Sequence, residues 1–202
     1  LDTEEEKETV LGADEIRVHV DAFSLNFADY NRWQNQYVFP TKFPFVPGLE
    51  VIGSVVEDTQ GELLGKTVYG IAVSEGAARK EVVLSRNLVT TIDSATAMDF
   101  LVGGLPMLTA CALLNRYPPK HEKIAVTAAS SCVSTFLIGL ISSGWSQEED
   151  HDIIAVSNHP GANAFKLEEL EFSVEMSIYD SWGGDCLVQI VDNCAPRTDI
   201  VT

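Results

Sequence analysis

The stretch that decides the fold runs from residue 15 to residue 55 and reads EIRVHVDAFSLNFADYNRWQNQYVFPTKFPFVPGLEVIGSV. In its first part, Ile16, Val18 and Val20 alternate with polar side chains, which is the period of a strand with one buried face. His19 is then a solvent-side strand residue. The alternation breaks at an Asn/Asp-rich turn and resumes after a Pro-Gly corner at residues 47–48. These residues predict two strands of one β-rich domain.

The rest of the first half continues the β pattern and then changes character. The strand after the Pro-Gly corner covers residues 49–57, and two more strand-like segments, at 67–72 and 80–84, lie between Gly, Pro and Asp residues. Their spacing is typical of a small barrel. From residue 94 to 114, apolar side chains recur at helical spacing behind a cap at Asp93-Ser94. We therefore expect a barrel-like first domain over residues 1–119.

Residues 120–202 are expected to form a second domain. The pattern is strand, tight polar turn, helix and strand, at residues 124–128, 129–132, 133–143 and 152–157. Such a βαβ unit predicts a parallel sheet covered on both faces. A short helix opening at Pro160-Gly161 and ending at Glu171 is expected next, followed by strands at 175–179 and 186–191. The chain is thus predicted to be α/β, a barrel-like domain followed by a partial Rossmann-type sheet.

Composition and charge limit the classes of partner. Hydrophobic residues make up 46% and charged residues 21%, which suits a chain with a buried core. Thirty acidic and 13 basic side chains give a net charge of −17, which repels nucleic acid and anionic membrane surfaces. No apolar run approaches the roughly 20 residues of a membrane span, and the acidic N-terminus is unlike a targeting leader. We expect a cytoplasmic protein, and, because residue 1 is Leu, an N-terminus that is processed or cut from a longer chain.

The four cysteines form no C-x-x-C pair and none lies near a His at metal-ligand spacing. We therefore expect reduced, mostly buried thiols. They are Cys111, Cys132, Cys186 and Cys194.

Several motifs carry a family resemblance. They are Leu25-Asn26-Phe27-Ala28-Asp29, Tyr37, the run PFVPGLE at residues 44–50 with Gly53, and the run GGLPMLTA at 103–110. They are similar to the zinc-free medium-chain dehydrogenases/reductases of the quinone oxidoreductase or enoyl reductase type. The resemblance implies a GroES-like barrel, a dinucleotide-binding domain, NADPH as cofactor and hydride transfer to an enoyl or quinone substrate. A polyketide-synthase enoyl reductase segment is compatible with the same motifs.

By this resemblance, Asn26, Tyr37 and Thr109 line the nicotinamide and substrate cleft. Asn26 and Thr109 would act by hydrogen bonding, and Tyr37 as a proton donor or substrate contact. A purely structural interpretation stays open for each residue. Asn26 and Asp29 are common turn formers, Tyr37 suits a half-buried aromatic position, and Thr109 suits a helix.

The cofactor loop of that family falls on residues 124–134, IAVTAASSCVS. Its glycines permit a tight turn, close approach of the pyrophosphate and packing of helix on strand. In this chain, the four positions of the family's glycines are occupied by Ala128, Ser131, Cys132 and Ser134. Two neighbouring positions, Thr127 and Val133, match the family. All four replacements are small, which is compatible with the turn. The Cβ atoms of Ser131 and Cys132, however, would occupy space that the pyrophosphate of a cofactor should enter. Either the helix N-terminus still binds an anion, or the joint no longer binds a nucleotide.

The end of the second strand bears on cofactor choice. Ser157-Asn158-His159 stands where an NAD-preferring protein places an acidic residue for the ribose hydroxyls, so NADPH is expected. Lys166 and His159 are the nearby groups able to meet its 2′-phosphate.

Zinc is not expected, because the zinc-dependent relatives carry an early Cys, a Gly-His-Glu and a four-Cys lobe, whereas this chain has Gly48-Leu49-Glu50. Glu50 is expected to cap or pair locally. Two functions stay open: an NADPH-dependent reductase, or a catalytically inactive reductase-like scaffold or subunit. In either case we expect a homo-oligomer or larger assembly that covers the open sheet edge, and no nucleic-acid or membrane partner.

Overall fold

The computed structural model describes residues 10–73, 76–145, 151–158, 165–172 and 174–202. The chain packs into two compact units, Leu1–Gly104 and Leu105–Thr202. The functional division into residues 1–119 and 120–202 stays a prediction.

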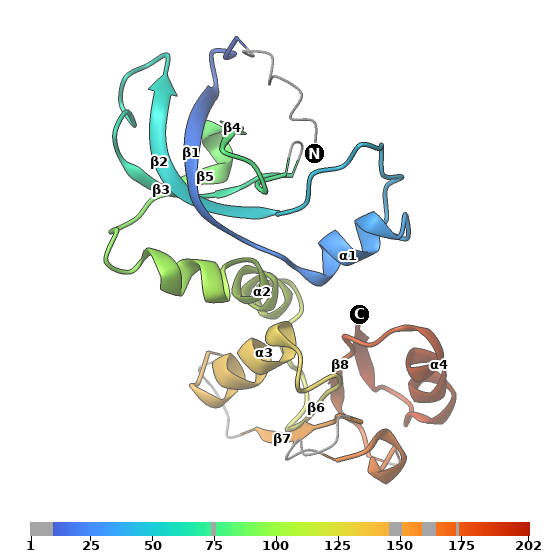
Figure 1. Ribbon diagram of the computed structural model, residues 1–202. Helices are drawn as coiled ribbons and strands as arrows, with labels where there is room; N and C mark the ends of the chain where they lie inside the picture. The colour runs from blue at the N-terminus through green and yellow to red at the C-terminus, as the bar shows by residue number, and fades with distance from the viewer. Residues whose placement is uncertain (1–9, 74–75, 146–150, 159–164, 173) are drawn as a thin grey trace. The chain divides into compact units, whose positions relative to one another are not determined.

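The first unit is built on a five-stranded antiparallel sheet. Its strands are β1 (Glu15–Ser24), β2 (Glu50–Asp58), β3 (Thr67–Ile71), β4 (Glu81–Ser85) and β5 (Val89–Thr91), in the order β4-β1-β2-β3-β5. The sheet curls around one apolar core (Figure 1). Ile16 and Val18 are fully buried in it, as the alternation in β1 predicts. The β-rich N-terminal domain is confirmed, and the short strand β5, which follows the single 3₁₀ turn η1 (Arg86–Leu88), is additional.

The expected Asn/Asp-rich turn is wrong, because this segment forms the short helix α1 (Phe27–Trp33). Asn26 is its N-cap, with the extended backbone (φ −109°, ψ 163°) that precedes a helix. Asn and Asp are favoured at helix N-termini as strongly as in turns. Composition alone therefore did not separate the two structures.

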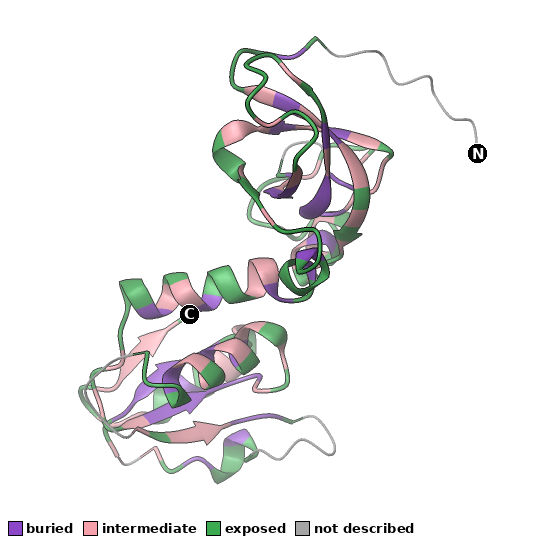
Figure 2. Ribbon diagram, turned by 90° about the vertical axis from the view of Figure 1, so that its left-hand side faces the viewer, coloured by how far each residue is buried: buried purple, intermediate pink, exposed green. Residues whose placement is uncertain are grey.

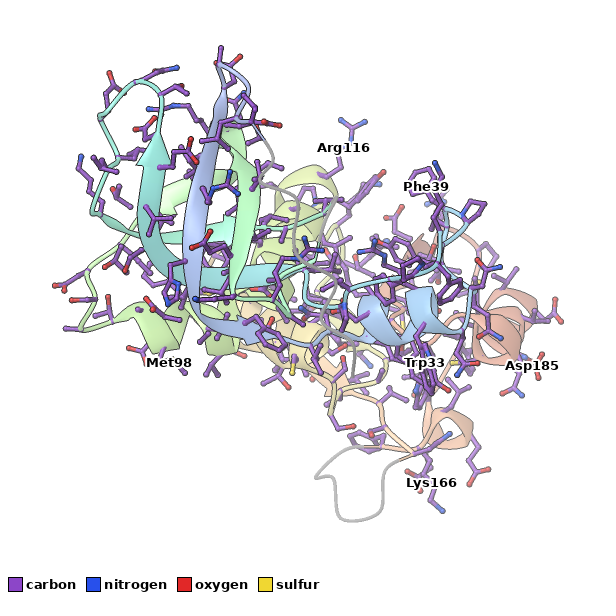
Figure 3. The ribbon with its side chains drawn as sticks, turned by 45° about the horizontal axis from the view of Figure 1, so that its top comes forward. Trp33, Phe39, Met98, Arg116, Lys166 and Asp185 are labelled. Carbon is purple, nitrogen blue, oxygen red and sulfur yellow. The ribbon has the colours of Figure 1, made fainter. Side chains whose placement is uncertain are left out.

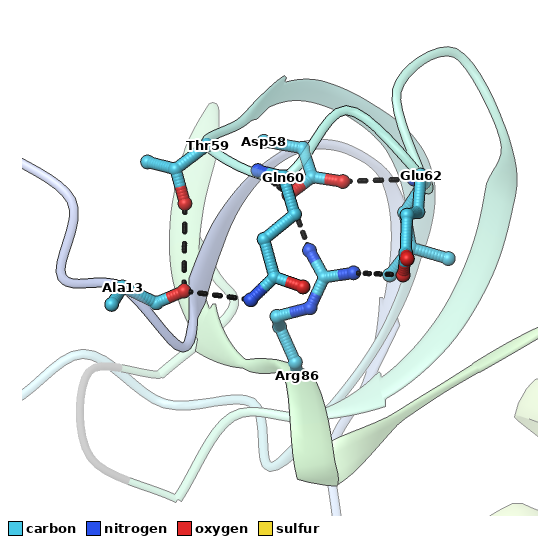
Figure 4. A network of polar contacts seen from close by, with 7 residues as sticks. Ala13, Asp58, Thr59, Gln60, Glu62 and Arg86 are labelled. Atoms are coloured by element: carbon cyan, nitrogen blue, oxygen red, sulfur yellow. Dashed lines mark hydrogen bonds and ion pairs between the residues drawn. The ribbon is translucent and has the colours of Figure 1, made fainter.

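A polar network closes one end of the first unit (Figure 4). Arg86, which follows β4, forms ion pairs with Asp58 at the end of β2 and with Glu62, whose Oε2 lies 3.0 Å from Nη2. The N–H of Gln60 donates to Asp58 (3.0 Å), and its side-chain amide donates to the carbonyl of Ala13 (3.1 Å). The network ties the start of β1 to the β2–β3 turn.

The long helix α2 (Ala97–Arg116) corrects one expectation. By length and apolar composition it is able to cross a membrane, although the sequence was expected to hold no such run. A core helix of a water-soluble protein has the same length and composition, so one helix of this kind is weak evidence for a membrane span. Leu101 packs with Ile52 and Tyr69 in the first unit, while Ala110 and Leu114 belong to a core of the second.

The second unit holds a four-stranded parallel sheet. Its elements are β6 (Lys123–Val126), α3 (Cys132–Ser142), β7 (Asp152–Ala155), the 3₁₀ turn η2 (Leu167–Glu169), β8 (Ser177–Tyr179), α4 (Gly184–Asn193) and β9 (Asp199–Val201). The strand order is β7-β6-β8-β9. Ile124 and Val126 pack on one face with α3, and Ala125 packs on the other with Ile190 of α4. Buried residues accordingly concentrate on the two central strands, β6 and β8, of this sheet (Figure 2). The predicted parallel sheet covered on both faces is confirmed.

Two element predictions in this unit need correction. Residues 186–191 form part of helix α4 rather than a strand. A short apolar run fits either period, and Asp185 in the first turn complements the helix dipole. Of the helix expected up to Glu171, residues 159–164 lie outside the described residues, and the described part holds only η2.

Candidate functional site

Asp29 fastens the two family motifs of the first unit together. Its side chain is buried, with 4% exposed. Oδ2 accepts the N–H of Asn26 (2.9 Å), and Oδ1 accepts the N–H of Gly48 (2.8 Å). Gly48 has φ +96°, a left-handed conformation that suits glycine at this Pro-Gly corner. The start of α1 is therefore held against the corner by one carboxylate.

Glu50, which is fully buried, is the centre of a second network. Its Oε1 accepts hydrogen bonds from Ser24 Oγ and from Asn26 Nδ2, both at 2.8 Å, and its Oε2 accepts one from the Tyr69 hydroxyl at 2.7 Å. Burial, together with the hydrogen bond and charge of Glu50, raises the pKa of Tyr69 above its usual value, so Tyr69 remains a donor. The expectation that Glu50 pairs locally is wrong: its partners lie 19 to 26 positions away.

This network also orients Asn26. The amide nitrogen of Asn26 donates to Glu50 and, at 3.1 Å, to Ser24 Oγ. Asn26 lies at a cavity of about 340 Å³ that Tyr30, Trp33 and Phe45 also line. The rings of Tyr30 and Trp33 meet edge to face, with centroids 6.1 Å apart. The side-chain amide of Asn26 is therefore fixed by hydrogen bonds at the edge of a cavity with aromatic walls.

Tyr37 lines a different cavity of the same unit. This cavity has a volume of about 500 Å³ and shares Phe45 with the Asn26 cavity. Tyr37 is 39% exposed, in the loop after α1 that also carries Phe39 (Figure 3). Thr109 belongs to α2 in the second unit, is exposed, and donates its hydroxyl to the carbonyl of Leu105 (2.8 Å). The two candidates of the first unit thus lie at neighbouring cavities.

The predicted cofactor corner follows β6. The neighbours of β6 in the sheet are β7 and β8, so the chain changes direction beside β6. Ligands of open α/β sheets bind outside the carboxyl ends of the strands at such a switch point. Ala128 there has φ +47°, the left-handed conformation that a glycine would adopt without strain. The turn therefore survives without its glycine.

The start of α3 occupies the same corner. Ser131 is the N-cap, and its Oγ accepts the N–H of Ser134 at 3.2 Å. Cys132, the first helical residue, is exposed and Val133 is half-buried. The first N–H groups of a helix have no partner within it, and the dipole places partial positive charge there. The corner can therefore receive an anion.

Two of the predicted cofactor residues are turned inward. Thr127 and Ser134 are completely buried. The Thr127 hydroxyl donates to Asp180 Oδ1 (2.6 Å), and the Ser134 hydroxyl donates to the Thr127 carbonyl (2.8 Å). Ser134 thus occupies a position where helix and strand pack closely, and its hydroxyl has a hydrogen-bond partner there. These two side chains therefore stabilise the corner through buried hydrogen bonds.

Asp180 is a residue that the sequence reasoning missed. It follows β8 directly, is 6% exposed, and accepts the N–H groups of Trp182 (3.2 Å) and Gly183 (2.8 Å). The available signal was its position, an acidic residue at the carboxyl end of a predicted parallel strand. Burial, and then the charge of Asp180, raises the pKa of Cys186 to about 11, so its thiol is protonated at neutral pH.

The end of β7 carries the remaining candidates. Ser157 is buried, and its Oγ lies 3.2 Å from Ser130 Oγ of the corner. Its N–H donates to the carbonyl of Phe165 (2.8 Å), which brings Lys166 alongside the strand end. Lys166 is exposed (Figure 3), with its Nζ 3.8 Å from Glu168 Oε1. His159 lies outside the described residues.

All four cysteines are free, as expected, but the expectation that most are buried is wrong. Cys132 is exposed and the other three are half-buried. Within the described ranges, no group of three or more His, Cys, Asp or Glu side chains is arranged to hold a metal ion.

Parts of this chain are similar in sequence to a known domain family and to known proteins. A family model for the alcohol dehydrogenase GroES-like domain matches residues 12–96. The quinone oxidoreductase-like protein 2 homolog of Nematostella vectensis is 33% identical over 88 residues, 42% of this chain and 24% of that protein. Quinone oxidoreductase-like protein 2 of Mus musculus is 29% identical over 136 residues, 63% of this chain and 38% of that protein. The chain therefore spans well under half the length of these relatives.

Solved structures show the same fold over nearly the whole chain. The quinone oxidoreductase of Thermus thermophilus, solved also with NADPH, has a TM-score of 0.74 and 19% identity, covering 97% of this chain and 67% of that one. The Escherichia coli quinone oxidoreductase complexed with NADPH has a TM-score of 0.73 and 20% identity, covering 96% and 67%. The GroES-like match covers less than half of this chain and the relatives are matched over part of their length, so the chain is similar to medium-chain dehydrogenases/reductases of the quinone oxidoreductase type and shares their fold.

Proposed function

We propose that this chain is part of an NADPH-dependent reductase that transfers hydride to an activated C=C or quinone substrate. The observation that carries the proposal is the corner after β6. Ala128 keeps the left-handed turn at the sheet's switch point, and α3 begins beside it with its first residue, Cys132, exposed. Relatives that are quinone oxidoreductases, two of them solved with NADPH, support the same assignment.

The corner suits a phosphate group. The free N–H groups at the start of α3 and the hydroxyls of Ser130 and Ser131 are hydrogen-bond donors for an anion. The carboxylate of Asp180 already accepts hydrogen bonds from Thr127, Trp182 and Gly183 and lies buried. Lys166 beside the end of β7 supports NADPH over NADH, because an ammonium group attracts a 2′-phosphate. When bound, NADPH supplies the hydride.

On the substrate side, we assign Asn26, Tyr37 and Thr109 to positioning and hydrogen bonding. Asn26 is held by Glu50 and Ser24, which lowers the cost of ordering it when a ligand binds. The Tyr37 hydroxyl at its cavity is able to donate a hydrogen bond to a substrate oxygen that gains charge. Thr109, on α2, contributes a hydroxyl in the second unit.

One observation favours a second candidate, a catalytically inactive scaffold or subunit. Side chains stand at all four glycine positions of the cofactor loop, and those of Ser131 and Cys132 lie where the backbone must approach a pyrophosphate. For either candidate, β7 and β9 are the outer strands of the sheet, and pairing of such an edge supports the expected oligomer or larger assembly. A cytoplasmic location stays a prediction.

Titration with NADPH, followed by cofactor fluorescence and thermal shift, separates the two candidates. At 100 times its dissociation constant, a ligand adds about 2.7 kcal/mol of stability. The informative variant is the double substitution Ser131→Gly/Cys132→Gly, which clears the corner at small cost because Gly is tolerated at an N-cap. Ser143→Gly, at the other end of α3, is the matched control.

We expect the chain to bind NADPH more tightly than NADH, and the double variant to bind several-fold more tightly than the wild type or the control. NADPH consumption at 340 nm with 1,2-naphthoquinone then reports turnover. The reductase proposal is wrong if millimolar NADPH raises the unfolding temperature of neither the wild type nor the glycine variant. The inactive scaffold is then the remaining candidate.

A further inference from the structure

The cavity that Tyr37 lines has an unusual balance of charge. Three cationic residues border it, Arg32 from α1, Lys42 from the following loop and Arg79 before β4. None of its described lining residues is acidic. The whole chain carries only 13 Lys and Arg against 30 Asp and Glu. Among the described lining residues, Arg32 and Lys42 therefore place positive charge at one cavity of an acidic chain, and such a field attracts anions.

Two of these cations are available to a ligand. Neither Arg32 nor Lys42 forms an ion pair with another described residue. The guanidinium of Arg32 lies over the ring of Phe45, 4.6 Å from its centroid, which fixes its direction while leaving its N–H groups for an acceptor. Lys42 is exposed. A guanidinium held on an aromatic ring is suited to bidentate contact with a carboxylate.

Most of the other residues that line the cavity are apolar or aromatic. Its wall includes the aromatic rings of Tyr37, Phe39 and Phe45 and the side chains of Val46 and Leu49. The volume of about 500 Å³ is in the range of small-molecule sites. A strictly inorganic anion would leave this surface unused, whereas a ligand with a hydrocarbon part would cover it.

One polar group in the wall is unsatisfied. The hydroxyl oxygen of Thr41 is buried and has no hydrogen-bond partner in the described part of the chain. Its backbone N–H donates to Asn35 Oδ1 at 2.9 Å, which holds this stretch of the loop in place. A buried hydroxyl without a partner costs free energy unless a ligand or water meets it. Thr41 therefore supplies a hydrogen-bonding group between the apolar wall and Lys42.

We propose that this cavity binds a carboxylate joined to a hydrocarbon chain, with the carboxylate at Arg32 and Lys42 and the chain along the aromatic wall. Resting on the reductase function proposed above, this assigns the substrate to unsaturated or carbonyl compounds that carry a carboxylate. Tyr37, at the same cavity, then lies beside the hydrocarbon part of the substrate.

The test measures binding of octanoate to the whole chain by isothermal titration, without NADPH. We expect wild type to bind octanoate, and Arg32→Gln and Lys42→Gln each to weaken binding about tenfold or more, because each loses a charge-assisted contact. Lys66→Gln, an exposed lysine in the β2–β3 turn of the same unit, is the matched control and should bind like wild type. Arg32→Lys, which keeps the charge, should recover part of the loss.

Neutral 1-octanol and inorganic phosphate separate the two parts of the ligand. We expect octanol to bind more weakly than octanoate and to be unaffected by Arg32→Gln. Equal binding of inorganic phosphate and octanoate, or octanoate affinity unchanged in both glutamine variants, would overturn the proposal. Circular dichroism of each variant verifies folding. Because no cofactor is present, failure here is distinct from failure of NADPH binding, which concerns the corner after β6.

Discussion

Gly104 lies in α2 at a point where a side chain has no room. A Cβ built there overlaps Oε2 of Glu50 and the hydroxyl of Tyr69, the two atoms joined by the buried 2.7 Å hydrogen bond. Both belong to the network that holds Asn26. The substitution Gly104→Ala therefore tests whether α2 is packed directly against this network.

The expected magnitude follows from three contributions. Ala in place of a helix-interior Gly gains about 0.8–1.0 kcal/mol of helix propensity. Forcing a methyl group into a filled site costs about 1–3 kcal/mol, and separating Tyr69 from the carboxylate of Glu50 costs about 1.5–3 kcal/mol, the value of a hydrogen bond to a charged group. Gly104→Ala should therefore destabilise the first unit by about 1.5–5 kcal/mol.

Gly139 offers the matched control. It lies inside α3, and nothing lies within 4 Å of a Cβ built on it. Gly139→Ala should stabilise the second unit by about 0.5–1 kcal/mol. Urea unfolding followed by circular dichroism shows whether each variant has a higher or lower free energy of unfolding than the wild type. Hydrogen exchange of peptides from β2 and β3 against peptides from β6 shows which unit is affected.

The reasoning is refuted if Gly104→Ala is as stabilising as Gly139→Ala, or if its effect appears only in the exchange of β6. Either result would mean that the Glu50 carboxylate and the Tyr69 hydroxyl do not lie against α2. Tyr69→Phe is a useful second variant, because it removes the donor without adding volume and should by itself cost about 1.5–3 kcal/mol.

The remaining predictions concern charge and reactivity. The N–H groups of Leu63 and Gln60 and the charge of Arg86 hold the pKa of Asp58 below its usual value, so its contribution to stability is present above the unfolded pKa of about 3.9. It is lost as pH falls through the lowered folded value. Thermal unfolding from pH 7 to 3 should therefore show wild type more stable than Asp58→Asn at pH 7, with the gap closing below about pH 4; a gap constant over this range contradicts the assignment. Alkylation at pH 7.5, read by peptide mass spectrometry, should modify exposed Cys132 before Cys186, whose raised pKa leaves little thiolate; the reverse order would refute the environment described for Cys186.

Prediction from sequence succeeded where the signal was local and failed where two local signals coincide. Asn26 and Asp29 suit a turn and a helix start equally, and the helix was missed. The apolar run at 186–191 fits a strand or a buried helix face, and its packing through Ile190 decided for the helix. The seven-residue family motif at 44–50 indicated the corner at Gly48, but the hydrogen bond from Gly48 to Asp29 could be seen only in the folded chain.

By itself, the sequence determined the alternation of β1, the βαβ pattern and the family resemblance, because these depend on neighbouring residues and on the period of a strand or helix. Only the tertiary structure decided the partners of Glu50, the burial of Asp180 and the gathering of Arg32 and Arg79 at one cavity. Those groups lie far apart along the chain. Burial and hydrogen bonding between distant residues depend on strand order and register, which no local pattern contains.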